Sequence, residues 1–194
     1  KKGQFIKERV AFVNPQNKSF NINDKDFDIV VICCGAFSKR LINQLETKKI
    51  PLETERGYHL EYMGIQDHLT RPTSLVEAGI YLTPLEYGIR AAGTVEIAGI
   101  KNIINKSRLN YIHYHAGKLI PKLNDYQNSW LGFRPTLPDC LPIISDSLNH
   151  ENLYYGFGHN HLGWTLGPIT GKIITGIING EEKINSAFSL SKYL

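Results

Sequence analysis

The stretch Gly156–Pro168, GFGHNHLGWTLGP, lies between two segments of different periodicity and constrains the fold more than any other part of the chain. The run NLYYGF before it is short and aromatic, which predicts a strand over residues 152–157. The run PITGKIITGIING after it carries isoleucines at helical spacing, which predicts a helix over residues 168–180 that begins at Pro168. A helix start presents unpaired backbone N–H groups and the positive end of a dipole. The loop is therefore a candidate site for an anion, or for a group that becomes one.

Composition excludes several classes of protein. A chain of 194 residues with 42% hydrophobic side chains can form one domain with a real core or two small lobes, and no apolar run approaches the roughly 20 residues that span a bilayer. The net charge of +4 comes from cations scattered among acids, apart from KKGQFIKER at the start, so we interpret it as a solvated basic surface and expect no nucleic-acid partner.

The cysteines and the first residue bear on location and completeness. Three cysteines give neither a disulfide framework nor metal-ligand spacing, so we expect no metal site and a reducing cytoplasm. The chain begins with Lys1 rather than Met, carries no signal-peptide pattern and enters a strand-like segment almost at once. These features suggest a fragment.

The local patterns predict a mixed order of elements. FIKERVAFV reads as a strand, NPQNKSFNINDKD as a hairpin region, FDIVVICCGAF as a buried strand, and SKRLINQL as a helix that buries Leu41, Ile42 and Leu45. From RGYHLEYMG to VEIAG, short strands separated by Gly and Pro predict an antiparallel sheet. A helix is expected over residues 103–119, ended by Pro121, and the proline-rich SWLGFRPTLPDCLPII is expected to be an ordered loop.

Arg134 is the strongest candidate for chemistry. It follows a glycine and precedes prolines that stiffen the backbone, so its guanidinium can be aimed at a carboxylate and form two parallel hydrogen bonds. The alternative is a structural ion pair with Asp139.

Other candidates have simpler interpretations. Cys33 and Cys34 lie in the expected buried strand, where small apolar core residues are the ordinary interpretation and redox activity the alternative. His113 and His115 face different ways on a helix, and His159 with His161 lacks a third ligand, so no metal site follows. Tyr58 and His59 could both project into a pocket at the head of the sheet, or could simply pack.

Five segments resemble, in order and spacing, the C-terminal half of FAD-dependent D-amino-acid dehydrogenases and oxidases. They are DIVVICCGAFSKRL, RGYHLEY, IRAAGTVEIAG, SWLGFRPTLPDCLPIIS and NLYYGFGHNHLGWTLGPITGKIITGIING, and they cover nearly the whole chain. The most specific parts are a Trp-x-Gly-x-Arg-Pro motif with a following Pro-Asp, and the Gly-His loop that runs to Leu-Gly-Trp-Thr. The matching residues of the first motif are Trp130, Gly132, Arg134, Pro135, Pro138 and Asp139.

The resemblance implies roles for individual residues. It assigns the substrate carboxylate to Arg134. Tyr58 and His59 are further catalytic candidates because of their position at the head of the sheet, and the resemblance adds nothing to them. It places the flavin ring near its N1 and C2 carbonyl against Gly158, His159, Gly163, Trp164, Thr165 and Leu166. There, backbone N–H groups would stabilise the negative charge of a reduced flavin. It places the adenosine half of FAD beside Cys33, Cys34 and Gly35, with a backbone contact from Val10.

The sequence also departs from the family pattern. The family's opening G-x-G-x-x-G turn, which holds the FAD pyrophosphate, is missing from this sequence. Asn160 and His161 replace small loop residues, and Cys140 replaces a glycine that usually follows Pro-Asp.

The resemblance implies an α+β fold: an α/β FAD-domain remnant of residues 1–45 and 145–194, and an antiparallel substrate-binding domain of residues 46–144. The activity it implies is oxidation of the Cα–N bond of D-amino acids to imino and then keto acids, by hydride transfer to flavin N5, with oxygen or a quinone as electron acceptor. The fragment by itself is expected to be inactive and to lack FAD. The alternatives are a cofactor-free binding or structural remnant and the FAD domain of a tRNA-modifying enzyme. A cytoplasmic location is expected, with peripheral association at the inner face of the membrane left open.

Overall fold

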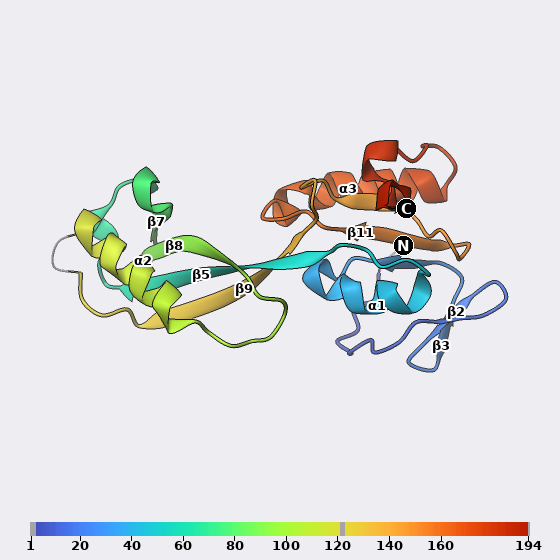
Figure 1. Cartoon of the computed structure of the whole chain (residues 1–194), viewed down its shortest axis with the longest axis horizontal. Helices are drawn as coiled ribbons and strands as arrows, with labels where there is room; N and C mark the ends of the chain where they lie inside the picture. The colour runs from blue at the N-terminus through green and yellow to red at the C-terminus, as the bar shows by residue number, and fades with distance from the viewer. Residues whose placement is uncertain (1–2, 121–122, 194) are drawn as a thin grey trace. The chain divides into compact units, whose positions relative to one another are not determined.

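The structure, a computed structural model, describes residues 3–120 and 123–193, and the chain divides into two compact units (Figure 1). Unit 1 comprises residues 1–53 and 135–194, and unit 2 comprises residues 54–134. The boundaries therefore differ from the expected ones at residues 46 and 145. The reason is that Ile50, Leu52, Leu137 and Ile143 are at most 3% exposed and belong to the hydrophobic core of unit 1.

Unit 1 is built on two small sheets. Strands β1 (Asn14–Pro15), β2 (Phe20–Ile22) and β3 (Lys25–Phe27) form an antiparallel sheet in that order. The second sheet has the order β10 (Ile143–Asp146), β11 (Leu153–Phe157), β4 (Val30–Ile32). Strand β11 is antiparallel to β10 and parallel to β4, with Tyr155 opposite Ile32. The expected contact between the strand of Ile32 and the strand of Tyr154 is confirmed.

Two helices lie on opposite sides of β11: α1 (Ser38–Leu45) and α3 (Gly163–Ile178) (Figure 1). Because side chains alternate along a strand, Leu153, Tyr155 and Phe157 of β11 share the core that contains α1, while Gly156 faces Ile174 of α3. The predicted burial of Leu41, Ile42 and Leu45 on α1 is confirmed. Short 3₁₀ helices follow β4 (Gly35–Phe37) and close the chain (Ser186–Phe188 and Leu190–Tyr193).

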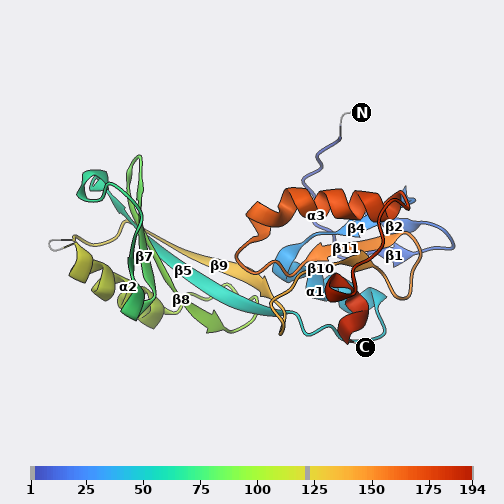
Figure 2. The ribbon, with the colours of Figure 1, turned by 90° about the horizontal axis from the view of Figure 1, so that it is seen from above.

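Unit 2 is a five-stranded sheet covered on one face by helix α2 (Lys106–Leu119) (Figure 2). The strand order is β6 (Thr73–Leu75), β7 (Ile80–Leu85), β8 (Gly88–Ile97), β5 (Glu53–Met63), β9 (Asn128–Thr136), and the pairs from β6 to β5 are antiparallel. Two 3₁₀ turns, Gln66–His68 and Val76–Ala78, flank β6. The core consists of alternate β5 residues packed against α2, namely Tyr58, Leu60 and Tyr62 against Leu109, Ile112 and Ala116. The predicted antiparallel sheet is confirmed, and the chain has the predicted α+β class.

Several predicted elements were wrong in their bounds or type. The segment over residues 5–13 forms no regular strand. Helix α2 begins at Lys106 rather than at residue 103, because Asn105 caps it by accepting a hydrogen bond from the N–H of Ser107 (3.1 Å). Pro121, expected to end this helix, lies outside the described residues.

The region expected to be a loop around Arg134 is strand β9. Pro135 is tolerated there because β9 is an edge strand, which has one row of backbone groups that pair with no other strand. Helix α3 begins at Gly163, five residues before the predicted start. Pro168 therefore lies inside the helix, where it removes the N–H that would bond the carbonyl of Trp164.

Candidate cofactor and substrate sites

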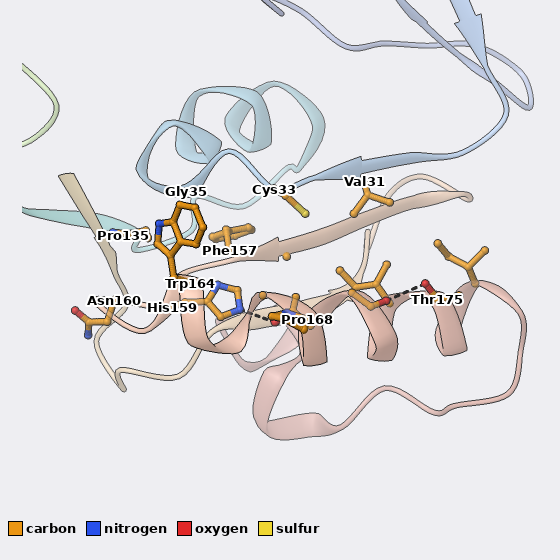
Figure 3. A pocket seen from close by; sticks show the side chains of 17 residues that line it. Val31, Cys33, Gly35, Pro135, Phe157, His159, Asn160, Trp164, Pro168 and Thr175 are labelled. Atoms are coloured by element: carbon orange, nitrogen blue, oxygen red, sulfur yellow. Dashed lines mark hydrogen bonds between the residues drawn. The ribbon is translucent and has the colours of Figure 1, made fainter. Parts of the chain in front are cut away.

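A cavity of about 880 Å³ lies within unit 1, between one face of α3, the end of β4 and the loop that joins β11 to α3 (Figure 3). Gly156 brings α3 close to β11, because a Cβ at this position would lie 2.9 Å from Ile174 Cδ1 and 3.0 Å from Cys33 Sγ. Two glycines of α3, Gly167 and Gly171, also line the cavity. A Cβ on either would meet no atom within 4 Å, so the space beside the helix backbone is empty there. A flat ligand can therefore approach the backbone of α3 along this line of glycines.

The loop before α3 depends on two left-handed residues. Gly158 has φ 86°, and a Cβ there would lie 2.6 Å from Leu137 Cδ1. Asn160 has φ 57°, and its N–H donates to the carbonyl of Pro135 (3.0 Å). These two residues turn the chain so that His159 and Asn160 line the cavity.

The start of α3 has no side-chain cap. The residue before it, Leu162, has no side-chain oxygen, so the first N–H groups of the helix are left for a ligand or water. Trp164 projects from this first turn at the edge of the cavity with its side chain 99% exposed (Figure 3). The uncapped helix start expected at Pro168 therefore lies at Gly163, and its use by a group that becomes negative stays a prediction.

His159 is held by Thr170 of α3. Its Nε2 lies 2.8 Å from Thr170 Oγ1, and that hydroxyl donates to the carbonyl of Leu166 (2.8 Å). Since the hydroxyl proton is engaged, Oγ1 must accept, so Nε2 of His159 carries the proton and Nδ1 is the free acceptor. Burial lowers the pKa of His159, which favours this neutral form.

The predicted cofactor residues divide into two groups. Cys33, Gly35, His159, Gly163 and Trp164 line the cavity, whereas Cys34, Gly158, Thr165, Leu166 and Val10 do not. Val10 lies instead beside a small cavity of about 120 Å³ with Ile6 and Ile22. The sequence analysis placed Gly156 and Asn160 in the candidate loop without a contact role and missed Thr170, Gly167 and Gly171, although the four-residue spacing of Gly163, Gly167 and Gly171 was available as a signal.

The interpretation of Cys33 and Cys34 as buried core residues was wrong. Strand β4 ends at Ile32, and both cysteines are free thiols with exposed side chains. Partial desolvation nevertheless raises the pKa of both thiols, and the neighbouring Cys34 adds to the effect at Cys33. This environment favours the thiol over the reactive thiolate.

Arg134 lies on the open face of the sheet in unit 2, directly over Gly57 of the neighbouring strand β5. A Cβ at Gly57 would lie 2.5 Å from Arg134 Nη2 and 2.7 Å from Cζ. Within residues 3–120 and 123–193, the guanidinium makes no ion pair with a carboxylate. Asp139, its alternative partner, is engaged within unit 1 by Lys192 Nζ (2.8 Å) and Tyr193 Oη (2.7 Å).

Tyr58 and His59 point to opposite faces of β5, so the prediction that both line one pocket was wrong. Tyr58 is 2% exposed and donates to Glu96 Oε2 (2.5 Å) in the core beneath the sheet. Burial and the bond to Glu96 raise the pKa of Tyr58. His59 lies on the open face and stacks on Trp130, with ring centroids 5.0 Å apart.

His113 and His115 face different ways, as the helix periodicity predicted. His113 is within 3.1 Å of Tyr62 Oη, and His115 packs on Tyr111. Across the described parts of the chain, no group of three metal-ligating side chains is found.

Comparison with known proteins identifies the family. The profile for FAD dependent oxidoreductases matches residues 2–177, and the chain belongs to this family. It is 36% identical over 163 residues to a D-amino-acid oxidase of Bradyrhizobium diazoefficiens, covering 80% of this chain and 38% of the relative. It is 34% identical over 197 residues to a D-amino acid dehydrogenase of Vibrio atlanticus, covering 95% of this chain and 46% of the relative. The resemblance drawn from the motifs is confirmed.

Solved structures show the same fold. Glycine oxidase from Geobacillus kaustophilus superimposes with a TM-score of 0.80 at 19% identity, over 96% of this chain and 52% of that one. L-Proline dehydrogenase from P. horikoshii gives a TM-score of 0.73 at 19% identity, over 95% and 53%. The chain spans less than half the length of the two curated relatives and about half of these structures. No helix among the described residues is long and apolar enough to cross a membrane.

Proposed function

We propose that this chain forms the substrate-carboxylate site and the flavin-ring side of an enzyme that oxidises the Cα–N bond of α-amino acids. The observation that carries the proposal is the placement of Arg134 on the open face of the sheet, over Gly57 and without a carboxylate partner in the described chain. A guanidinium held flat on a backbone and left unpaired is suited to take the carboxylate of a ligand in a bidentate pair. The names of the relatives, D-amino-acid oxidase and D-amino acid dehydrogenase, agree with such a substrate.

The cavity of unit 1 has the features that a flavin ring requires. Its walls combine a glycine-lined helix face with the uncapped start of α3, so a planar ring can lie against backbone while N–H groups point toward a carbonyl or a negative ring nitrogen. When bound, FAD supplies the acceptor for the hydride that leaves the α-carbon. Gly163 and Trp164 are the proposed ring-side contacts, and Cys33 and Gly35 are the proposed contacts toward the adenosine half.

His159 is proposed to act in its neutral form. With Nε2–H directed to Thr170, its Nδ1 can accept a hydrogen bond from an N–H group in the cavity. A neutral imidazole adds no positive charge, so the stabilisation of a developing negative charge falls to the N–H groups of α3.

The amino acid is proposed to bind with its carboxylate on Arg134 and to react with its amine neutral. Loss of the hydride from Cα leaves a C=N bond, and water then hydrolyses the imino acid to a keto acid and ammonia. Arg134 orients Cα in this scheme and donates no proton, because a guanidinium stays charged at any working pH. The relatives are named as an oxidase and as a dehydrogenase, and either oxygen or a quinone could receive the electrons.

The proposal is tested by NMR titration of the chain with D-alanine and D-phenylalanine. We expect shifts of backbone amides of β5 and β9 around Gly57 and Arg134, and loss of these shifts in Arg134→Lys. The matched control is Arg71→Lys, an exposed arginine of the same unit that lines neither the cavity of unit 1 nor the cavity of unit 2 described below. If Arg134→Lys binds amino acids as the wild type does, the assignment of the carboxylate to Arg134 is wrong.

A further inference from the structure

A second cavity, of about 590 Å³, lies wholly within unit 2, and the proposed function gives it no role. Its lining residues are His59, Glu61, Arg90, Asn128, Ser129 and Trp130. It therefore lies on the open face of the same sheet that carries Arg134, in the same compact unit.

One wall of this cavity is aromatic, and two contacts hold it in place: one of Trp130 with Gly132 and one with His59. The indole of Trp130 folds back over Gly132, where any Cβ would overlap the six-membered part of the ring. Its plane is nearly parallel to His59, with an interplanar angle of 12°. Trp130 remains 53% exposed, so part of the ring is available for contact with a ligand. An exposed, immobilised ring is a favourable surface for an apolar or aromatic side chain.

The other wall is a balanced ion pair. Glu61 Oε1 accepts from Arg90 Nη2 (2.9 Å) and Nε (3.2 Å) and from Tyr87 Oη (3.2 Å), while Oε2 accepts from Asn128 (3.4 Å). Arg90 uses its Nε–H and one Nη2–H in the bonds to Glu61 and also interacts with the Tyr87 hydroxyl, so some of its five N–H groups remain for a neutral acceptor. His59 Nε2 lies 3.6 Å from Glu61 Oε1. The lining carries one positive and one negative charge, so its net charge is zero when His59 is neutral.

The strand register relates this cavity to Arg134. Gly57, His59 and Glu61 are alternate residues of β5 and so share one face, and the guanidinium lies over Gly57. At about 3.4 Å per residue, the cavity begins about 7 Å and ends about 14 Å along the strand from that guanidinium. The near end of the cavity, at His59 and Trp130, is therefore within reach of the side chain of an amino acid whose carboxylate is at Arg134.

We propose that this cavity receives the side chain of the amino acid held by Arg134 and selects uncharged side chains that carry a ring or an amide. The inference rests on the proposed function and adds the substrate class. The ring of Trp130 provides the apolar contact, and the free N–H groups of Arg90 bind a neutral oxygen or nitrogen of the side chain.

Charged side chains are excluded by the Glu61–Arg90 pair. A carboxylate that approaches Arg90 also meets Glu61, and an ammonium that approaches Glu61 also meets Arg90, so neither finds a net opposite charge. Each would lose water on entry without a compensating partner. A single substitution of Glu61 or Arg90 would give the cavity a net charge and so change which side chains it accepts.

The first test uses tryptophan fluorescence in a Trp164→Phe background, where Trp130 is the remaining tryptophan of the two in the chain. We expect D-phenylalanine and D-glutamine to change Trp130 emission at concentrations about tenfold lower than D-alanine, D-glutamate or D-lysine. Equal affinities for all five amino acids would overturn the proposal.

The second test is a gain of binding, which misfolding cannot imitate. Glu61→Gln leaves Arg90 unopposed and should raise affinity for D-glutamate about tenfold, whereas Arg90→Gln leaves Glu61 unopposed and should raise affinity for D-lysine by a similar factor. If neither variant gains affinity for the matching charged amino acid, the side chain does not reach this cavity.

A third test, with a ligand that lacks a carboxylate, distinguishes failure of this inference from failure of the proposed function. Phenethylamine has the ring and amine of phenylalanine but no carboxylate. If it binds as tightly as D-phenylalanine and Arg134→Lys has no effect, the carboxylate role of Arg134 fails while the ring site stands. If D-alanine binds as tightly as D-phenylalanine and both are lost in Arg134→Lys, the carboxylate site stands and the side-chain site fails.

Discussion

Gly57 and Arg134 lie on neighbouring strands, and the side chain of Arg134 packs in the space left by the absence of a side chain at Gly57. The guanidinium of Arg134 occupies the space where a Cβ of Gly57 would lie, at 2.5 Å from Nη2. Because β5 continues from Gly57 to His59 and Glu61 on the same face, this contact also sets the position of the Arg134 guanidinium, the proposed carboxylate ligand, relative to the second cavity. The position of the arginine is thus encoded partly in a residue of another strand.

Gly57→Ala should therefore displace Arg134 while leaving the sheet intact. The clash involves the far end of a flexible side chain, so we expect a change in unfolding free energy below about 1 kcal/mol. Because the Arg134 guanidinium would no longer be held in position, binding of α-amino acids should weaken about tenfold or more. NMR titration measures the binding and thermal unfolding the stability.

The matched control for this substitution is Gly117→Ala in α2. A Cβ at Gly117 meets no atom within 4 Å, so alanine should stabilise the helix by about 0.5 to 1 kcal/mol without affecting ligands. If Gly57→Ala binds amino acids as tightly as Gly117→Ala does, the packing of Arg134 on Gly57 has no role in recognition.

In an active, FAD-loaded enzyme that contains this chain, Arg134→Lys or Arg134→Ala should lose most catalytic efficiency and keep its FAD. A lysine point charge cannot replace the planar pair of hydrogen bonds that fixes Cα. Removing such a pair costs on the order of 2 to 5 kcal/mol in the transition state, or roughly 30-fold to several thousand-fold in kcat/KM. Steady-state kinetics with flavin absorbance as the loading control measures this. Near-normal efficiency in Arg134→Ala would assign the enzyme to amines without a carboxylate.

The sequence was sufficient to predict the elements whose signal is local. Leu41, Ile42 and Leu45 have helical spacing and are buried on α1, and β11 carries the aromatic run that pairs with β4. Arg134 was a candidate from the glycine before it and the prolines after it, and the family resemblance added its role as carboxylate ligand. Its contact with Gly57 depends on the alignment of β9 with β5, which no local pattern encodes.

The errors arose where tertiary contacts decide the structure. The rule for proline at a helix start placed the beginning of α3 at Pro168, but the helix is extended to Gly163 by the turn at Gly158 and Asn160. The apolar run through Cys33 and Cys34 suggested a long buried strand. Strand β4 ends after three residues, and the chain then turns at Gly35, which has φ 54°. Tyr58 and His59 were grouped by adjacency, although adjacent strand residues face opposite ways.

Cys140→Gly should stabilise the protein. Cys140 has φ 59°, a left-handed conformation that costs a non-glycine residue about 1 kcal/mol, and its side chain is exposed, so little packing is lost. We expect a gain of about 0.5 to 1 kcal/mol in the unfolding free energy by chemical denaturation. Cys140→Ala is the control, since it removes the thiol and keeps the strain. An equal gain in both variants would attribute the effect to the thiol.

Acid should weaken unit 1 in part through Asp139. Burial alone would raise the pKa of Asp139, but hydrogen bonds from Lys192, Tyr193 and the N–H of Leu141 outweigh it and hold the pKa below its usual value. A carboxyl group whose pKa is lower in the folded state contributes stability that is complete above its unfolded pKa of about 3.9 and is lost as the pH falls through the folded pKa. Asp139→Asn should therefore be less stable than the wild type at neutral pH and equal to it in strong acid. Urea unfolding between these limits measures the difference in unfolding free energy. If Asp139→Asn and the wild type show the same dependence on pH, the contact of Asp139 with Lys192 contributes no stability.

The 194-residue chain, purified by itself, is expected to be colourless. The cavity beside α3 offers contacts to a flavin ring, but the sequence has no G-x-G-x-x-G turn to hold the pyrophosphate, which in dinucleotide sites sits on a helix start of its own. Contacts to the flavin ring alone must then offset the entropy cost of ordering the long, flexible FAD molecule, without contacts to its pyrophosphate. Absorbance of the purified chain after incubation with excess FAD and gel filtration measures retention. If the ring-side contacts form transiently, the 99% exposed Trp164 should change its emission when free FAD is added to the wild-type chain, and Trp164→Ala, which lacks this ring, is the control. A yellow preparation near one flavin per chain would show that the contacts of unit 1 suffice for stable binding.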